Sequence, residues 1–234
     1  VSMMYVNNET GYILPVKEVF SAINRRMPDI ITHTDCVQAY MKLPVKVSAL
    51  NADLVSLSAH KIHGVKGVGA LYIRKGVRVL PIVTGGKQEK GIRSGTESVP
   101  LIAAFGAAVE KMLPTVAQRY EKALRLKAYL LEKLGGIEGV EVNSPGDGSP
   151  YVINISAGGK RSEIMLHFLE SREIYVSSGS ACSKGQQSGV LGQFGIRDKR
   201  ADSALRVSIT AETTEAELDA FCEGLHIGME KVRG

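Results

Sequence analysis

The sequence predicts an α/β domain over residues 1–113 and a smaller α+β domain over residues 114–234. In the first stretch, short apolar segments alternate with helical patterns and with glycine-rich loops, which is typical of strands and helices built around one sheet. A long helical pattern then meets Pro114, which has no backbone N–H to donate and therefore ends or kinks a helix. We place the domain boundary at this proline.

The first domain is expected to begin with a strand at Ser2–Val6 and a helix at Pro15–Arg26. Apolar residues at helical spacing give this helix one apolar face, formed by Val16, Val19, Phe20 and Ile23. Four more apolar segments are expected to be strands: Ile30–Asp35, Ala52–His60, Gly69–Gly76 and Val77–Val83. After a glycine-rich loop at 84–98, a helix should start near Ser98 with Pro100 in its first turn.

The second domain continues the helix that Pro114 interrupts and then adds shorter elements. The segments expected to be strands are one near Val140, Tyr151–Ser156, 173–179 and 204–210. Ser162–Ser171 has the pattern of an amphipathic helix. A final helix should begin at Thr214, because Glu217 follows at the spacing of a capping box.

Composition narrows the class of protein. The chain has 234 residues, of which 44% are hydrophobic, the share of an ordinary globular protein. Its net charge of +5 (29 Lys and Arg less 24 Asp and Glu) is spread along the chain and suits a site for anionic small molecules. Without a basic stripe interleaved with aromatic residues, direct nucleic-acid binding is not expected. No apolar run is judged long enough to span a bilayer, so no membrane partner is expected.

The cysteines and the first residues carry two further expectations. Cys36, Cys182 and Cys222 are an odd number without close spacing, which argues against a disulfide framework or a metal site and favours a reducing, cytoplasmic compartment. The chain opens VSMMYVNNETG, without an initiator methionine and with apolar alternation from the first residue. We therefore expect the back portion of a longer protein, whose N-terminal part is missing or is a separate chain.

Asp35 is a candidate site residue because it ends a short apolar strand. Open α/β sheets bind ligands beyond the carboxyl ends of their strands. His33 shares a strand face with Asp35, and Gln38 follows in the next turn. A carboxylate there could pair with a protonated ring nitrogen, while an amide could bind a nearby oxygen. The alternative is an Asp that caps a helix beside a surface Gln.

Lys61 follows the next strand, between His60 and His63. A lysine bonds covalently to an aldehyde only if its amine is partly neutral, which needs desolvation or a nearby positive charge. The alternative is a solvated surface lysine. A strand-end Asp35 followed by Lys61, with Ser58 and His60 as oxygen binders, is the arrangement that a pyridoxal phosphate site requires.

Three later motifs each allow two interpretations. Gly95 and Thr96 precede a helix, where they could bind a phosphate or simply cap the helix. Cys182 lies in a loop of small residues and is a candidate nucleophile or an incidental exposed thiol, whereas Cys36 is expected to pack. Arg206 interrupts an apolar strand; it either faces solvent, which alternation favours, or binds a carboxylate.

Together these segments resemble the cysteine desulfurases, pyridoxal-phosphate enzymes of the class V aminotransferase group. The motifs that carry the resemblance occur in the family's order: YVNNETG, HTDCVQA, SLSAHKIHGVKGVGALYIRKG, GGKQEKGIRSGTES, SSGSACSKG and LRVSIT. They extend from Val1 to about Thr214, and the long stretch between Cys182 and Arg206 is similar to the NifS/IscS-like branch. The resemblance implies a remnant of the large domain of the PLP-dependent transferase fold (fold type I) and a small C-terminal domain with the cysteine loop.

The resemblance also implies roles for individual residues. Lys61 would bind the cofactor covalently, and Cys182 would receive sulfur. The other cofactor-binding residues would be Asp35 at the ring nitrogen, Gln38 at the ring hydroxyl, and Ser58, His60 and Thr96 at the phosphate. Thr96 would reach the cofactor of a second subunit, which implies a homodimer. Asn7 and Arg206 would hold the substrate carboxylate. The family's ring-stacking histidine is matched by neither His33 nor His63.

The activity implied is that of a transferase, a cysteine desulfurase that moves sulfur from L-cysteine to Cys182 as a persulfide and releases alanine. The resemblance further implies a sulfur-acceptor or scaffold protein as partner, with iron–sulfur cluster assembly, tRNA thiolation and a dedicated pathway all open. The alternatives are another class V enzyme, such as a selenocysteine lyase or an aminotransferase, and a non-catalytic desulfurase-like binding subunit.

Overall fold

A computed structural model of the chain describes residues 1–44, 46–178 and 189–232. The chain divides into two compact units. The first unit comprises residues 1–5 and 14–116, and the second comprises residues 6–13 and 117–234. Segment 6–13, which the sequence analysis groups with residues 1–113, therefore belongs with the C-terminal part of the chain.

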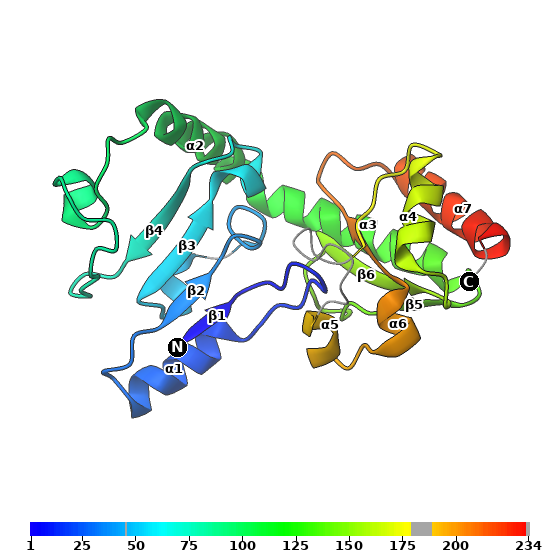
Figure 1. The fold of residues 1–234 in the computed structure, drawn as a ribbon, viewed down its shortest axis with the longest axis horizontal. Coiled ribbons are helices and arrows are strands. Elements are labelled where there is room, and N and C mark those ends of the chain that lie inside the picture. Colours follow the sequence, from blue (N-terminus) through cyan, green and yellow to red (C-terminus); the bar gives the residue numbers. More distant parts are fainter. Residues whose placement is uncertain (45, 179–188, 233–234) are drawn as a thin grey trace. The chain divides into compact units, whose positions relative to one another are not determined.

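The first unit is built on a four-stranded sheet in the order β1-β2-β3-β4, seen side by side in Figure 1. The strands are β1 (Ser2–Met4), β2 (His33–Asp35), β3 (Leu54–Ser58) and β4 (Gly69–Ile73). The first three strands are parallel, and β4 is antiparallel to β3. Because parallel strands end at the same edge of a sheet, the residues that follow β2 and β3 lie at one edge.

Two α-helices of the first unit, α1 (Val16–Arg26) and α2 (Val99–Met112), each bury apolar residues. The unit also contains the 3-10 helices η1 (Val47–Leu50), η2 (Ala59–Ile62), η3 (Gln88–Gly91) and η4 (Leu113–Thr115). Helix α1 buries Val16, Phe20 and Ile23. Helix α2 buries Phe105 and Met112 in one cluster with Ala59 and Ile62 of η2. This packing fixes η2, which directly follows β3.

Asp53 ties three strands of this sheet together just before β3. It is 1% exposed, and its Oδ2 accepts hydrogen bonds from Thr32 N (2.7 Å) and Thr32 Oγ1 (3.0 Å). Its Oδ1 accepts from Arg74 Nε (2.6 Å), directly after β4. Burial alone would raise the pKa of Asp53, but the hydrogen bonds from Thr32 and Arg74 lower it.

The second unit contains an antiparallel sheet in the order β5-β6-β7. Its strands are β5 (Val140–Val142), β6 (Val152–Ala157) and β7 (Ala204–Ser208). Its helices are α3 (Val116–Gly135), α4 (Ser162–Glu170), α5 (Gly189–Gln193), α6 (Asp198–Asp202) and α7 (Glu215–Lys231). Thr214 and Glu217 form the expected capping box at the start of α7, with the Thr214 backbone N donating to Glu217 Oε2 at 2.8 Å.

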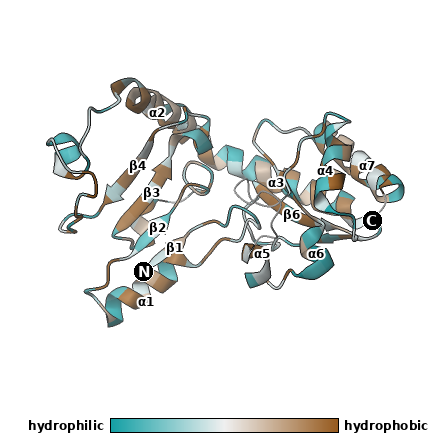
Figure 2. Cartoon of the chain, viewed as in Figure 1, coloured by the Kyte–Doolittle hydropathy of each residue, from teal (hydrophilic) through white to brown (hydrophobic). Residues whose placement is uncertain are grey.

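The two faces of this sheet differ in chemistry because side chains alternate along a strand. Ile153, Ile155 and Leu205 face one core with apolar residues of α3, α4 and α7. Figure 2 shows the brown, hydrophobic colour of β6 and the teal, hydrophilic colour of α6. The opposite face carries Asn154 and Arg206, which bond to segment 6–13. A polar sheet face is thus covered by a polar segment from the start of the chain.

Two expectations about elements are wrong in the described residues. Segment 77–83 forms no strand; Pro81 can donate no ladder hydrogen bond, and Leu80 and Ile82 are exposed. Segment 173–178 makes a single bridge, from Ser177 to Arg206, and is not a strand. The loop after it contains the short helices α5 and α6. Pro114 does interrupt the helix as expected, since η4 separates α2 from α3.

The expectation about membrane-spanning segments also needs correction. Among the described residues, one helical stretch, Val99–Gly135, is long and apolar enough to cross a membrane by length and composition. Two structural observations weigh against that use. The stretch is broken by η4, and its second half packs Leu126, Leu130 and Leu134 into the core of the second unit. Helices of protein cores meet the same length and composition test, although only 11% of the apolar window in this stretch is buried among the described residues.

We expect Asp53→Asn to lower the free energy of unfolding by about 2 kcal/mol at pH 7, because charged hydrogen bonds inside the sheet are lost. The folded pKa of Asp53 lies below its unfolded value, so its stabilisation is present above about pH 4 and disappears as the pH falls through the lowered pKa. Urea unfolding from pH 7 down to about pH 3 should show the wild-type and variant curves converging.

Asp29→Asn, at an exposed position, is the matched control and should follow the wild type at every pH. A difference between Asp53→Asn and wild type that stays constant with pH would contradict this role for the carboxylate.

Candidate functional site

The carboxyl edge of the first sheet gathers four of the predicted site residues. Asp35 is the last residue of β2, and Ser58 is the last residue of β3. The strands are parallel, with Asp35 opposite Ser56, so both ends reach the same edge. His60 and Lys61 follow at once in η2. A carboxylate, a hydroxyl, an imidazole and an amine therefore come from two adjacent strand ends.

The hydrogen bonds at this edge are local. Asp35 Oδ1 accepts from Val37 N (2.8 Å), which holds the carboxylate in a tight turn after β2. Ser58 Oγ and His60 Nδ1 lie 2.7 Å apart and share a proton whose side depends on the histidine tautomer. Gln38 Oε1 accepts from Lys42 Nζ (3.1 Å). Asp35 and His60 are exposed, so both can meet a ligand.

Lys61 is held at its backbone and partly covered at its side chain. Its neighbours Ala59 and Ile62 are buried against α2, which fixes the turn that carries it. His63 ends η2 in a left-handed conformation (φ 60°). Lys61 is thus carried by a turn whose flanking residues are fixed by packing. Thr96 lies exposed in the loop before α2, and its contact with a second subunit's cofactor stays a prediction.

Asn7 and Arg206, the predicted carboxylate binders, both belong to the second unit. Asn7 is 3% exposed, and its Oδ1 accepts from Glu9 N (2.9 Å), Thr10 N (2.9 Å) and Thr10 Oγ1 (3.0 Å). The side chain therefore shapes the turn that follows it. Gly11 closes this turn with φ 72°, and a Cβ there would collide with Val152 O. We call residues 7–11 the asparagine turn.

Arg206 is only partly exposed, whereas alternation favours a side chain that faces solvent. It does point away from Leu205 and Val207, but the asparagine turn covers that face. Its Nη1 donates to Asn8 O (3.1 Å) and its Nη2 to Ser177 Oγ (3.2 Å). Burial lowers the pKa of Arg206, while the nearby Glu9 carboxylate opposes this effect.

One donor of Arg206 has no partner within the described part of the chain. Its Nε is buried without a hydrogen bond. A buried N–H that lacks a partner is costly, so this atom is a candidate contact for a ligand. The Nε–Nη2 edge of a guanidinium binds a carboxylate through two parallel hydrogen bonds. The donor set therefore fits an anionic ligand group at Arg206.

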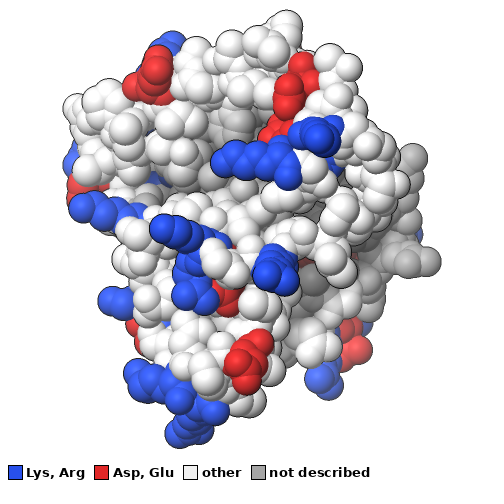
Figure 3. Space-filling model, turned by 90° about the vertical axis from the view of Figure 1, so that its left-hand side faces the viewer, with Lys and Arg blue, Asp and Glu red and all other residues white. Residues whose placement is uncertain are grey.

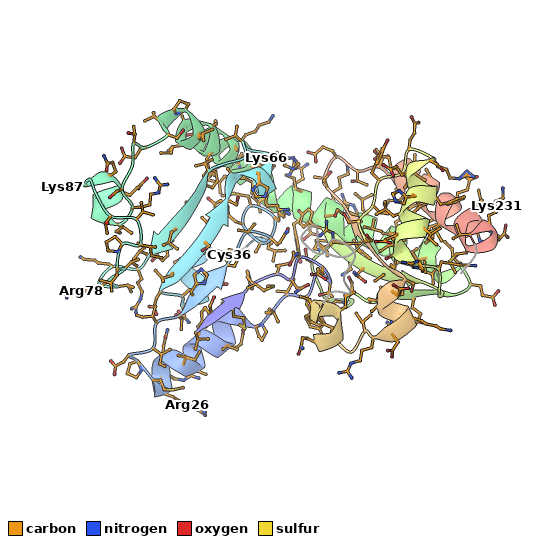
Figure 4. All side chains as sticks on the ribbon, in the orientation of Figure 1. Arg26, Cys36, Lys66, Arg78, Lys87 and Lys231 are labelled. Atoms are coloured by element: carbon orange, nitrogen blue, oxygen red, sulfur yellow. The ribbon has the colours of Figure 1, made fainter. Side chains whose placement is uncertain are left out.

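Two of the three cysteines lie in the described residues, and Cys36 is packed as the sequence predicts. Cys36, labelled in Figure 4 near β2, and Cys222 of α7 are buried and unpaired. Burial raises the pKa of each thiol to about 11, so both are poor nucleophiles at neutral pH. Cys182 lies outside the described residues, and its role stays a prediction.

Sequence reasoning missed the residues that hold the asparagine turn. Asn154 in β6 donates from Nδ2 to Glu9 O (3.2 Å), and Ser144 Oγ donates to Thr10 O (2.5 Å). The helical pattern that contains Lys127 of α3 predicts nothing about its role. A usable signal existed for Asn154, which is a polar residue inside the apolar run of β6. Its binding partner, however, lies 145 residues away in the chain.

Lys127 is buried and supports the loop that carries Ser144 and Ser149. Its Nζ donates to three backbone carbonyls, Pro145 O (2.9 Å), Gly146 O (3.0 Å) and Gly148 O (3.0 Å). The three donors of an ammonium group are thereby satisfied. Burial lowers the pKa of Lys127, and the Asp147 carboxylate opposes this effect. The same loop reaches the asparagine turn, because Ser149 N donates to Gly11 O (2.7 Å).

These features define a class. A strand-end aspartate and a lysine directly after the neighbouring strand are the protein groups with which pyridoxal-phosphate enzymes hold their cofactor. The chain belongs to the aminotransferase class-V family, whose model matches residues 1–221. Class V aminotransferases and their cysteine desulfurase relatives depend on pyridoxal phosphate. The sheet, the strand-end residues and the family thus agree.

Individual relatives extend the comparison. The mitochondrial cysteine desulfurase of Eremothecium gossypii is 40% identical over 238 residues, which cover 100% of this chain and 48% of the relative. A solved structure described as a NifS-like protein is 33% identical with a TM-score of 0.90, covering 98% of this chain and 60% of that one. SspA in complex with cysteine is 30% identical with a TM-score of 0.73, over 91% of this chain and 59% of SspA.

The chain spans about half the length of the curated relative and three fifths of the solved structures.

Charge on the molecular surface adds one observation. On the face shown in Figure 3, Lys and Arg side chains lie in several groups, with Asp and Glu side chains among them.

We expect Cys36 and Cys222 to resist alkylation in the folded protein, because burial raises the pKa of both thiols to about 11. Treatment with iodoacetamide at pH 7.5, followed by peptide mass spectrometry, should label both thiols on the order of a hundredfold more slowly than in urea. Equal labelling with and without urea at either position would show that the thiol is accessible.

Proposed function

We propose that the chain is part of a cysteine desulfurase, a transferase that moves sulfur from L-cysteine to Cys182 as a persulfide and releases alanine. One observation carries the proposal. Asp35, Ser58, His60 and Lys61 meet at one sheet edge, in a chain whose whole length aligns with proteins named cysteine desulfurases. SspA, a neighbour in structure, was solved in complex with cysteine, which supports the choice of substrate.

The residues at the sheet edge suit pyridoxal phosphate by their chemistry. Asp35 would bind the protonated ring nitrogen, and Gln38 would bind the ring hydroxyl. Ser58, His60 and Thr96 would bind the phosphate, and Lys61 would hold the cofactor covalently. When bound, the cofactor supplies an electron sink that stabilises negative charge at the substrate Cα.

The protein groups then have three tasks. Arg206 and Asn7 orient the cysteine by its carboxylate, and Lys61 removes the proton from Cα. The thiolate of Cys182 attacks the substrate sulfur, so that an S–S bond forms while the C–S bond breaks. The electron pair of the broken bond stays with carbon, which is protonated and leaves as alanine. Sulfur remains on Cys182 for a later acceptor.

The wider setting follows from the same proposal. A homodimer would supply Thr96 to the second cofactor site. A scaffold or acceptor protein would take the persulfide sulfur, for example for iron–sulfur cluster assembly. The unpaired thiols of Cys36 and Cys222 support a reducing compartment, and we propose the cytoplasm.

We expect Cys182→Ala to reduce sulfide release from L-cysteine to background in the whole protein, because no thiolate remains to attack the substrate sulfur. The absorbance of the bound cofactor should not change. Sulfide would be measured colorimetrically in the presence of a thiol reductant. Cys222→Ala is the matched control and should retain activity. Normal sulfide release by Cys182→Ala would remove Cys182 from the mechanism.

We expect Lys61→Ala to abolish covalent attachment of pyridoxal phosphate. Incubation with the cofactor, reduction with borohydride and intact-mass spectrometry should give a pyridoxyl adduct on the wild type and none on the variant. Lys66→Ala, at the exposed lysine labelled in Figure 4, is the matched control and should still form the adduct. An adduct that persists in Lys61→Ala would move the attachment to another lysine.

A further inference from the structure

Asn154 is a buried polar residue in a strand that is otherwise apolar or small. Every residue of β6 is buried, and Asn154 is 0% exposed. A buried amide destabilises a protein unless its donors and acceptors are bonded. Its Oδ1 accepts from Asn143 Nδ2 (2.7 Å), and its Nδ2 donates to Glu9 O (3.2 Å). The amide oxygen of Asn154 thus bonds to Asn143, directly after β5, and its amide nitrogen bonds to the asparagine turn.

The position of Asn154 in the sheet places it beside Arg206. The two residues are direct partners in the β6–β7 register, so their side chains emerge on the same face. They bond to consecutive carbonyls of the asparagine turn, Arg206 to Asn8 O and Asn154 to Glu9 O. The pair therefore holds the turn at two adjacent points.

The asparagine turn in return limits where the guanidinium of Arg206 can lie. Its Nη1 is bonded to Asn8 O, so a shift of the turn would carry that hydrogen bond with it. The unpartnered Nε of Arg206 lies on the same planar group and would change direction as well. The side chain of Asn7 is set by the same turn, because its Oδ1 bonds to Glu9 N and Thr10 N.

We propose that Asn154 is a positioning residue for the carboxylate of an α-amino acid substrate. Its amide fixes the asparagine turn on β6 and thereby sets the direction of Arg206 and Asn7, which bind the carboxylate. This inference rests on the proposed function for the identity of the ligand. The part that concerns the turn rests on the hydrogen bonds of the chain alone.

The test compares Asn154→Leu with Ser156→Ala in the whole protein. Leucine has a similar size and cannot donate to Glu9 O. Ser156 is two residues along the same strand and face, is buried, and bonds to Asn143 and to Arg200 O (2.6 Å). It has no hydrogen bond to the asparagine turn among those described. Ser156→Ala therefore removes a buried polar contact of the same network while leaving the turn held.

Hydrogen exchange of the amides at residues 9–12, followed without substrate, reads the position of the turn. We expect exchange on the order of tenfold faster in Asn154→Leu and unchanged in Ser156→Ala. If Asn154→Leu does not fold, Asn154→Asp takes its place, since aspartate still accepts from Asn143 but cannot donate to Glu9 O. Unchanged exchange in a folded variant would overturn the inference.

Kinetics then separate positioning from general damage. We expect Asn154→Leu to raise KM for L-cysteine on the order of tenfold and to leave kcat within about twofold. Inhibition by L-alanine, which has the carboxylate, should weaken in step, whereas inhibition by cysteamine, which lacks it, should not. Equal weakening of both inhibitors would overturn the role in carboxylate positioning. If the wild type releases no sulfide, the proposed function fails, and the exchange result still decides the role of Asn154 in the turn.

Discussion

A buried stretch of backbone must have its carbonyls bonded, and this requirement organises the second unit. The asparagine turn is a segment of this kind. The carbonyls of Asn8, Glu9, Thr10 and Gly11 are bonded in turn by Arg206, Asn154, Ser144 and the backbone of Ser149. The polar face of the sheet and the polar turn thus satisfy each other. Either one alone would leave buried donors or acceptors without partners.

The same requirement for bonded carbonyls applies at Lys127, which lies further from the turn. Three carbonyls of the loop at 145–148 converge on its ammonium group, which holds the loop in one conformation. The loop in turn places Ser144 and Ser149 against the turn. Hydrogen bonds therefore connect α3 to the segment that contains Asn7, a candidate for binding the carboxylate. The connecting groups are not themselves candidates for binding a ligand. Such supporting groups decide how accurately a binding residue is held.

Local patterns were sufficient to bring four candidate residues to one edge of the first sheet and insufficient for the surroundings of Arg206. Asp35, Ser58, His60 and Lys61 are placed by strand ends and a short turn, so a prediction of two strands already brings them together. Alternation correctly assigned Arg206 to the face opposite Leu205. What covers that face, however, comes from Asn8, 198 residues earlier, and no local pattern contains this information.

Errors about elements have a related cause. Segment 77–83 has the apolar and β-branched residues of a strand, but a strand also needs a neighbour, and none of the described strands pairs with it. Asn154 stands out locally only as a polar residue inside an apolar run, and this pattern does not indicate its partner. Its significance depends on the cross-strand position of Arg206, which only the register between β6 and β7 defines.

The path of the chain between the two units has a consequence for dissecting the protein. Residues 6–13 leave the first unit, join the second and return, and the chain passes over again after residue 116. A single cut near residue 116 would therefore not yield two self-sufficient modules. The C-terminal piece would lose the segment that covers its polar sheet face, and would expose the charge of Arg206 and the amide of Asn154 to solvent. The small domain is thus assembled from two separate parts of the polypeptide. A gene rearrangement that transferred this domain to another protein would have to carry residues 6–13 together with the C-terminal part.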